Sequence, residues 1–494
     1  MKKNYTIVFA VIVALIVLCA FWGCDSGGDD DSGSPSVSNP IGNAADLAKI
    51  GTPGYPLDGT YTLTADVTLP ADWTPIGTGT QPFTGTFDGG GYSITIGSTT
   101  ASSIAVRGFS SGVDISSGLD FASDWGFTGG IIARGLFAYT ENATIKDMNI
   151  AISPGSSFVI TSTATDQMQL FGTVAAAAVN TAFTNINISG GELDVDASAA
   201  DELYVGGIAG MIVEGSMTRC AMTGDVQVAS GTANNSIGGL VGEAYGSFLV
   251  NSSASGNVRV ESTAAGSDYV SAGGLVGKLD NSEDGSSAVI RKSYSTGTVS
   301  AVSTVGRARA GGIASRIRGS AEITDCYSTG NISASGGYSA EAGGIAGEAH
   351  ANGNVTIAIA HCYALGNVSG GAESGGGIVG NVQEGTSHED GPIIGSGSIS
   401  GCAALSGLVA GSSLSANRIV GSVSSGGPFS LNNNIAYDGM LVNTSTVSSI
   451  DDTDLNGADK TSAELANQAT YKAIGWDFDT VWKMEGGRPV LQWQ

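Results

Sequence analysis

Histidine and basic residues are scarce in this chain of 494 residues, and both shortages narrow its function. There are 3 His, and 20 Lys and Arg stand against 45 Asp and Glu. The histidines, His350, His361 and His388, form no Ser–His–Asp or Cys–His arrangement at a spacing typical of hydrolases. The formal net charge of −25 argues against nucleic acid as a partner and fits a soluble or cation-binding surface.

Charged side chains are few overall, at 13% of residues, about half the share of an average soluble protein. The hydrophobic share of 41% is nevertheless too high for a disordered chain. An amphipathic helical period is absent from the middle of the sequence, where short stretches alternate with period 2 instead, as at Val226/Val228 and Val258/Val260. With 76 glycines available for turns, the composition predicts many short strands.

The first 23 residues have the pattern of an export signal. A short basic start precedes a nearly unbroken apolar run from Thr6 to Trp22, which ends at Gly23 and Cys24. A small residue before a cysteine at this junction resembles a bacterial lipoprotein signal, in which Cys24 becomes the lipidated first residue. The apolar run also approaches the length of a membrane span, so an uncleaved anchor is the alternative. Residues 24–40 are acidic and of low complexity, and we expect a flexible tether there.

A glycine-flanked apolar box recurs through the middle of the chain, with starts 32, 35, 38, 32 and 33 residues apart. A period of this size without helices predicts parallel strands stacked about 4.8 Å apart, with a row of Val, Ile and Leu inside. The box is therefore predicted to be scaffold. Its copies are GGIAG at 206–210, GGLVG at 238–242 and 273–277, GGIAS at 311–315, GGIAG at 343–347 and GGIVG at 376–380.

Each box is followed by a short strand, a small residue or cysteine, a glycine turn and an alternating strand, as in AEITDCYSTGNISAS at 321–335. We place these repeats, including degenerate copies, at residues 135–460. Residues 41–134 are predicted to hold leader rungs and an N-terminal cap, with a short helix from Asn43 to Gly51. Residues 461–494 are predicted to form a C-terminal cap, with a helix from Ser462 to Ile474 and aromatic residues over the open edge of the stack.

The repeats resemble the GLUG motif of bacterial surface and secreted proteins. The resemblance rests on the boxes, on the CYSTGNIS and NSSASGNV segments, on the leader at 74–95 and on GWDFDTVWKMEGGRPVL at 475–491. It covers most of residues 41–494 and implies an all-β fold, a right-handed parallel β-helix. The family includes adhesin-like chains and one arm of immunoglobulin-cleaving proteases. Its repeat has no catalytic residues, so the resemblance implies fold and location rather than a ligand.

Four cysteines fall at one phase of the repeat, and the last three lie in consecutive repeats, where we expect them to stack about 4.8 Å apart. A ladder of small buried thiols, equivalent to Ser253, Ser293 or Ala436 in other copies, is the favoured interpretation. A disulfide between neighbours is the alternative. These cysteines are Cys220, Cys326, Cys362 and Cys402.

Asp452, Asp454 and Asn456 match the first half of a calcium loop, with oxygens at alternate positions and Gly457 at the sharp turn. The twelfth position of the loop is Ala463, where calcium loops have Glu. Calcium is the one cofactor that the sequence suggests, and an acidic turn without metal is the alternative.

Four arginines stand out against the acidic composition: Arg307, Arg309, Arg316 and Arg318. Each pair alternates with small or apolar residues, which predicts that both pairs face outward. Binding of an anionic glycan is one interpretation. Neutralisation of acids on neighbouring rungs is the other.

The sequence predicts a lipid-anchored, non-enzymatic β-helix of the bacterial envelope, at the outer membrane or cell surface, that acts in adhesion, ligand binding or envelope structure. Its partners would be the membrane, through the lipid on Cys24, and host or envelope glycans or proteins. The alternatives are a polysaccharide-degrading lyase or hydrolase and an accessory module of a secreted protease or surface complex. We expect the function to lie on the variable stretches Glu243–Gly246, Lys278–Ser287 and Gly97–Ile131.

Overall fold

A computed structural model describes residues 38–97, 106–107, 112–118, 130–160, 167–197, 202–231, 234–263, 269–282, 285–351, 355–384, 395–413, 415–424 and 429–494. Residues 38–494 form one compact unit. The export signal, Cys24 and most of the tether lie outside the described residues, as do His388 and most of the stretch Gly97–Ile131. Within the described ranges, no helix is long and apolar enough to cross a membrane.

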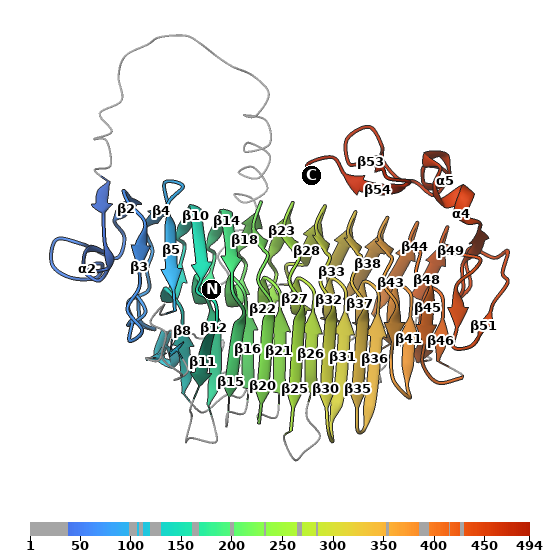
Figure 1. The fold of residues 1–494 in the computed structure, drawn as a ribbon, viewed down its shortest axis with the longest axis horizontal. Coiled ribbons are helices and arrows are strands. Elements are labelled where there is room, and N and C mark those ends of the chain that lie inside the picture. The colour runs from blue at the N-terminus through green and yellow to red at the C-terminus, as the bar shows by residue number, and fades with distance from the viewer. Residues whose placement is uncertain are drawn as a thin grey trace, which may run out of the picture. The chain divides into compact units, whose positions relative to one another are not determined.

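The unit is a parallel β-solenoid, as the repeat period predicts (Figure 1). Each strand pairs in parallel and in register with its equivalents one rung before and one rung after. Antiparallel pairs among the described strands are confined to the ends of the stack and the C-terminal segment. One rung consists of β21 (Asn234–Gly238), β22 (Val241–Tyr245), β23 (Phe248–Val250), β24 (Ser253–Ala254) and β25 (Val258–Ser262).

Equivalent strands of successive rungs form four sheets, which we number 1 to 4. Sheet 1 contains the strands equivalent to β23 and β24, and sheet 2 those equivalent to β25. Sheet 3 contains the strands equivalent to β21, and sheet 4 those equivalent to β22. Figure 1 shows sheets 3 and 4 as neighbouring rows of arrows.

The inside of the solenoid is filled by rows of apolar side chains that repeat from rung to rung. In sheet 2, Val226, Val258 and Val299 are register partners, and each is 1% exposed. The Ile or Leu of every box is also fully buried, which confirms its predicted place in the core. These residues are Ile208, Leu240, Leu275, Ile313, Ile345 and Ile378.

The paired glycines of the box form the corner between sheets 3 and 4. A Cβ on Gly206 would lie 2.1 Å from the carbonyl oxygen of Ala209, and one on Gly207 would lie 2.3 Å from the carbonyl oxygen of Gly239 in the next rung. Neither glycine has a positive φ. The box therefore needs glycine because the backbone packs closely at the corner, and it serves as scaffold.

The cysteine ladder is present, and its four cysteines are free and buried. In two rungs the residue at the ladder position differs from the prediction. It is Ser252 after Cys220, whose backbone N–H donates to Ser252 Oγ (3.2 Å). It is Asn434 after Cys402, whose backbone N–H donates to Asn434 Oδ1 (3.0 Å). The equivalence with Ser253 and Ala436 was wrong. A residue with positive φ precedes the ladder position in each rung, such as His361 at 52°, and it interrupts the simple alternation.

Asn43 caps the predicted N-terminal helix, since its side chain accepts a hydrogen bond of 3.0 Å from the backbone N–H of Asp46. This helix, α2 (Ala44–Leu47), is shorter than predicted. The chain continues in turns to Gly51, where φ is 94°.

The C-terminal segment differs from the prediction in two ways. Its helix divides into α4 (Ser462–Leu465) and α5 (Gln468–Ala473), because the Asn467 side chain accepts from the Ala469 N–H and begins a second helix. The aromatic part, with β53 (Trp482–Glu485) and β54 (Arg488–Leu491), packs on the outer face of sheet 1 rather than over the open edge (Figure 1).

The open edge of the stack is closed by other residues. The carbonyl oxygen of Leu455 accepts hydrogen bonds from the N–H groups of Ile419 (2.9 Å) and Val420 (3.2 Å), which belong to the last rung. The Leu455 side chain packs against the core. The aromatic residues of the C-terminal segment pack on sheet 1 because its outer face is apolar and includes Tyr327 and Tyr363.

Candidate functional site

Sheets 3 and 4 meet at the box corner, and their outer faces enclose a groove that crosses the rungs. Side chains two residues before the box line it from sheet 3, in the order Leu170, Tyr204, Ser236, Ser271, Arg309 and Glu341. Side chains five residues after the first glycine line it from sheet 4, in the order Ala177, Met211, Glu243, Lys278, Arg316 and Glu348.

These columns cross six successive rungs, of which the first contributes Leu170 from β12 (Met168–Gly172) and Ala177 from β13 (Ala175–Val179). The other five rungs carry the box. The strands of sheet 3 are β16 (Glu202–Gly206), β21, β26 (Tyr269–Gly273), β31 (Arg307–Gly311) and β36 (Ser339–Gly343). The strands of sheet 4 are β17 (Ala209–Val213), β22, β27 (Val276–Asp280), β32 (Ala314–Arg318) and β37 (Ala346–Ala351).

The groove is filled by apolar side chains at its N-terminal end. Leu170, Ala177 and Met211 are fully buried, and Tyr204 is 6% exposed. They form a cluster of their own, separate from the core inside the solenoid. This section therefore stabilises the corner and leaves no room for a ligand.

Further along, the groove is filled by a buried charge cluster. Arg309 is 2% exposed, and its Nε lies 3.3 Å from Glu341 Oε2 and 2.7 Å from Glu348 Oε2. Arg316 Nε lies 2.8 Å from the same Glu348 oxygen. The Tyr269 ring covers both guanidinium groups, at 4.9 Å from Arg309 and 5.6 Å from Arg316.

The two glutamates of this cluster respond in opposite ways. Burial favours the neutral acid at both sites. At Glu348 the charges of Arg309 and Arg316 outweigh burial, so the pKa is lowered. At Glu341 burial outweighs Arg309, so the pKa is raised. The difference follows from the number of guanidinium groups that each carboxylate contacts.

Between the apolar section and the charge cluster the groove is open. Ser236 and Ser271 stand there in the column that otherwise carries Tyr204 and Arg309, so two small side chains lie between two large ones. A cavity of about 420 Å³ results, which we call the notch. Its lining is Glu202, Tyr204, Asn234, Asn235, Ser236, Glu243, Tyr269, Ser271, Lys278, Arg316, Arg318 and His350.

One wall of the notch carries a lysine held by two acceptors. Lys278 Nζ lies 3.3 Å from Glu243 Oε2 and donates to the Tyr245 hydroxyl at 3.1 Å. The Tyr245 hydroxyl donates in turn to Glu243. Burial, followed by the charge of Glu243, raises the pKa of Tyr245 well above its usual value. The Tyr245 hydroxyl is therefore protonated at neutral pH.

The four predicted arginines lie in two different environments. The arginines lie on the outer faces of sheets 3 and 4, as predicted, but these faces enclose a groove that buries Arg309 and leaves Arg316 only partly exposed. Neutralisation of acids on neighbouring rungs is confirmed for these two. Arg307 donates to the Tyr269 hydroxyl at 2.9 Å, and Arg318 is exposed at the rim of the notch.

The predicted calcium residues lie in the turn that closes the last rung. Asp454 Oδ1 accepts from the N–H groups of Asn456 (2.7 Å) and Gly457 (2.8 Å), and Asn456 Oδ1 accepts from Arg418 N (3.3 Å). Two of the three oxygen-bearing side chains thus hold the turn. Across the residues that the structure describes, no three His, Cys, Asp or Glu side chains gather as metal ligands do. Calcium at Asp452, Asp454 and Asn456 stays a prediction.

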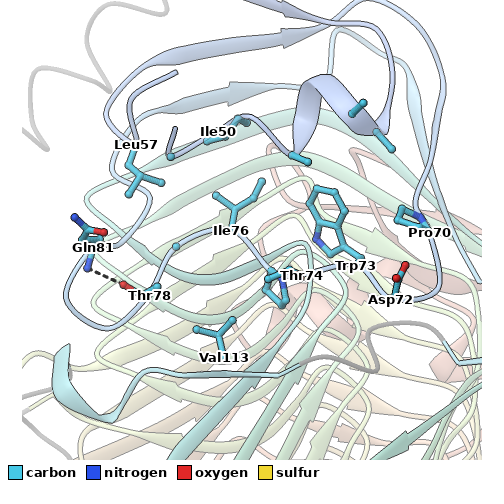
Figure 2. A pocket seen from close by; sticks show the side chains of 16 residues that line it. Ile50, Leu57, Pro70, Asp72, Trp73, Thr74, Ile76, Thr78, Gln81 and Val113 are labelled. Carbon is cyan, nitrogen blue, oxygen red and sulfur yellow. Dashed lines mark hydrogen bonds between the residues drawn. The ribbon is translucent and has the colours of Figure 1, made fainter. Parts of the chain in front are cut away.

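A second cavity, of about 610 Å³, lies at the N-terminal cap (Figure 2). It is bounded by the alanines of α2 and by apolar side chains, with Trp73 and Ile76 near its middle and Leu57 and Gln81 toward one side. The indole N–H of Trp73 donates to the carbonyl oxygen of Leu136 at 3.2 Å, so this ring is fixed as part of the wall. Its lining carries fewer polar groups than the notch.

The notch could have been found from the sequence by aligning the residue two places before each box. That alignment reads Tyr204, Ser236, Ser271, Arg309 and Glu341, and its two serines mark the gap. Sequence reasoning missed it because the box was aligned for its own scaffold role. It did point to Glu243 and Lys278, through the variable stretches that begin there.

The fold and the groove define the chain as a parallel β-solenoid with a polar notch on its outer face. No family model matches it. The chain is 30% identical to halomucin of Haloquadratum walsbyi (strain DSM 16790 / HBSQ001) over 190 residues, which are 37% of this chain and 2% of halomucin. It thus spans only 2% of the length of this curated relative.

Two solved structures match this chain over most of its length, with low TM-scores. One is a candidate immunoglobulin A1 protease from Bacteroides ovatus, with a TM-score of 0.36, 20% identity and coverage of 94% of both chains. The other is an IgA1 protease, with a TM-score of 0.38, 16% identity and coverage of 88% of this chain and 24% of that protein. Similarity at this level carries no information about activity.

Proposed function

We propose that this protein is an exported, lipid-anchored β-helix that binds a glycan in the notch and acts at the cell surface in attachment or envelope structure. The observation that carries the binding function is the interruption of a filled groove by Ser236 and Ser271. An interrupted column on a regular scaffold leaves a cavity of defined shape. Its lining of hydroxyls, amides, charged groups and tyrosine rings suits the hydroxyls and apolar faces of sugars.

Export and anchoring rest on the sequence features at residues 1–24. The long regular faces of a solenoid support an attachment role, since they offer extended surface to a polymeric partner. The net charge of −25 supports a glycan or protein partner over nucleic acid.

A polysaccharide-degrading activity is the second candidate, because the notch brings acids, a lysine and tyrosines together. Depolymerisation by elimination or hydrolysis needs a base that is deprotonated at working pH. Tyr245, beside Lys278, has a raised pKa and holds its proton. Glu243 is already bound by Lys278 and Tyr245. These two observations favour binding without turnover.

Binding is tested with the purified full-length chain in detergent against a panel of neutral and acidic polysaccharides. Ser271→Tyr is expected to fill the notch and to abolish binding of any polymer that the parent chain retains. Ser333→Tyr is the matched control, since Ser333 lies on the outer face of sheet 2. Binding that survives in Ser271→Tyr would contradict the proposed site. New reducing ends or unsaturated products would establish the second candidate instead.

A further inference from the structure

Among the described residues, Arg318 differs from the other cations that line the notch because no carboxylate oxygen lies within 4 Å of its guanidinium. Lys278 lies within 3.7 Å of both Glu243 and Asp280, and Arg316 is held by Glu348. In the part of the chain that the structure describes, Arg318 makes no ion pair within 4 Å. The Arg318 guanidinium, which acts on the Asp280 carboxylate only across more than 4 Å, is therefore available to a ligand at the rim of the notch.

His350 lies next to Arg318 on the following rung, since the two are register partners in β32 and β37. Nδ1 of His350 is buried and has no hydrogen-bond partner among the described residues. A buried polar atom without a partner costs free energy unless a ligand or water supplies one. Arg318 and His350 thus offer two adjacent unsatisfied groups on one side of the notch.

The floor of the notch offers neutral hydrogen-bonding groups. Ser236 donates to the carbonyl oxygen of Gly242 at 3.0 Å and keeps its oxygen as an acceptor. Ser271 is 5% exposed and makes no side-chain hydrogen bond within the described ranges. The floor therefore suits hydroxyl groups, whereas the rim at Arg318 suits an anion.

We infer that the notch binds an oligosaccharide in which one sugar carries an anionic group, a carboxylate or a sulfate, held by Arg318 and His350, while the sugars on the preceding rungs contact Ser271 and Ser236 through their hydroxyls. This inference rests on the proposed function and names its ligand class. A guanidinium binds either anion through two parallel hydrogen bonds. Of the four predicted arginines, this inference gives a role in recognition to Arg318 alone.

The direction of the bound polymer follows from the rung spacing. The lining residues come from five successive rungs, a length of about 19 Å at about 4.8 Å per rung. One rung is close to the length that one hexose adds to an extended chain. A polymer that runs along the solenoid axis therefore places successive sugars on successive rungs, with the anionic unit at the rung of Arg318.

The acidic character of the whole chain does not oppose this site. At physiological salt the Debye length is about 8 Å, so distant carboxylates are largely screened. Recognition is then a contact interaction within the notch. We expect short acidic oligosaccharides to bind as well per site as long polymers do.

The test is calorimetric titration of the full-length chain with a tetrasaccharide of galacturonic acid, with its methyl ester and with a sulfated galactan oligosaccharide of equal length. Arg318→Gln is expected to weaken binding of the anionic ligand at least about tenfold and to leave the methyl ester unchanged. Arg259→Gln removes the same charge from an exposed pair on sheet 2 and is expected to leave both ligands unchanged. Preference between the acid and the sulfate identifies the anion.

Two results would overturn the inference. If the acid and its methyl ester bind equally and Arg318→Gln binds both as the parent does, the notch recognises neutral sugars, and the proposed function stands when Ser271→Tyr still abolishes binding. If Arg318→Gln loses the methyl ester as well, Arg318 shapes the notch and does not hold the anion.

Discussion

The hydroxyl of Tyr363 donates a hydrogen bond of 2.9 Å to the backbone carbonyl of Pro489, 126 residues later in the chain. Tyr363 stacks on Tyr327 with ring centroids 4.9 Å apart and an interplanar angle of 7°. The C-terminal segment thus attaches to a ladder of tyrosines on sheet 1, and Trp482 packs over both rings. This contact makes residues 461–494 a lateral cover for several rungs.

Trp482→Ala is expected to detach this cover. Trp482 is fully buried and donates from its indole N–H to Asp325 at 3.3 Å. Removal of a buried tryptophan costs about 3–5 kcal/mol. Because solenoid rungs unfold in nearest-neighbour units, the loss should fall on residues 461–494 and the rungs beneath them. Limited proteolysis and hydrogen exchange of that segment measure it.

Trp493→Ala serves as the control, since Trp493 is 40% exposed and contacts the end of the ladder through Tyr294. It should release the segment far less. Equal protection of residues 461–494 in parent and Trp482→Ala chains would show that the segment does not depend on the ladder.

The two glutamates around Arg309 should give opposite dependences on pH. The pKa of Glu348 is lowered in the folded chain, so its stabilising effect is present above the unfolded value of 4.5 and is lost as pH falls through the folded value. The pKa of Glu341 is raised, so its effect is present below 4.5 and is lost as pH rises through the folded value.

Glu348→Gln should therefore be less stable than the parent chain by about 3–5 kcal/mol at pH 7, because it removes the carboxylate that pairs with Arg316 and one of the two that pair with the buried Arg309. The difference should narrow as pH falls below 4.5. Against Glu341→Gln, the parent chain should instead gain stability as pH falls from 7 toward 4.5. Chemical denaturation at several pH values measures both. Parallel trends for the two variants would contradict the opposite pKa shifts.

The fold could be predicted from sequence because stacked rungs repeat one local pattern. The box isoleucines and leucines, the period-2 valines and the Asn43 cap each express a local preference, and each is in its predicted role. The burial of Arg309 could not be predicted from alternation. Alternation separates the inside of the solenoid from the outside, but it does not show that two outer faces enclose a groove.

The location of the aromatic C-terminal segment also could not be predicted from a local sequence pattern. The sequence predicts that Trp476 and Trp482 cover the open edge, because unpaired strands need a cover. The edge is closed by Leu455, and the tryptophans pack on Tyr327 and Tyr363 instead. This choice depends on a tyrosine ladder that exists only once the rungs are stacked in register.

The cysteine ladder should resist alkylation in the folded chain. Burial raises the pKa of Cys220 to about 12 and those of Cys362 and Cys402 well above the usual value. Because the thiolate is the reactive form, the folded ladder should remain unmodified by iodoacetamide at pH 8. After denaturation without a reductant, all four cysteines of the ladder should react. Mass spectrometry of peptides reports each site.

An exposed cysteine provides the positive control. Thr356→Cys places a thiol on an exposed position of sheet 1 and should be modified in the folded chain. Ladder cysteines that need reduction before they react would reveal a disulfide between neighbouring rungs.

Substitution of a box glycine should be costly even though its φ is negative. A Cβ on Gly273 would lie 1.8 Å from the carbonyl oxygen of Val276, so Gly273→Ala must open the corner between sheets 3 and 4. Forcing extra volume into a packed site costs about 1–3 kcal/mol or more. Gly407→Ala is the matched control, because its Cβ would meet nothing closer than 3.4 Å. Hydrogen exchange over residues 269–282 should rise only in Gly273→Ala. Equal exchange in the two variants would mean that the corner yields without cost and that the box glycines are not needed for close packing.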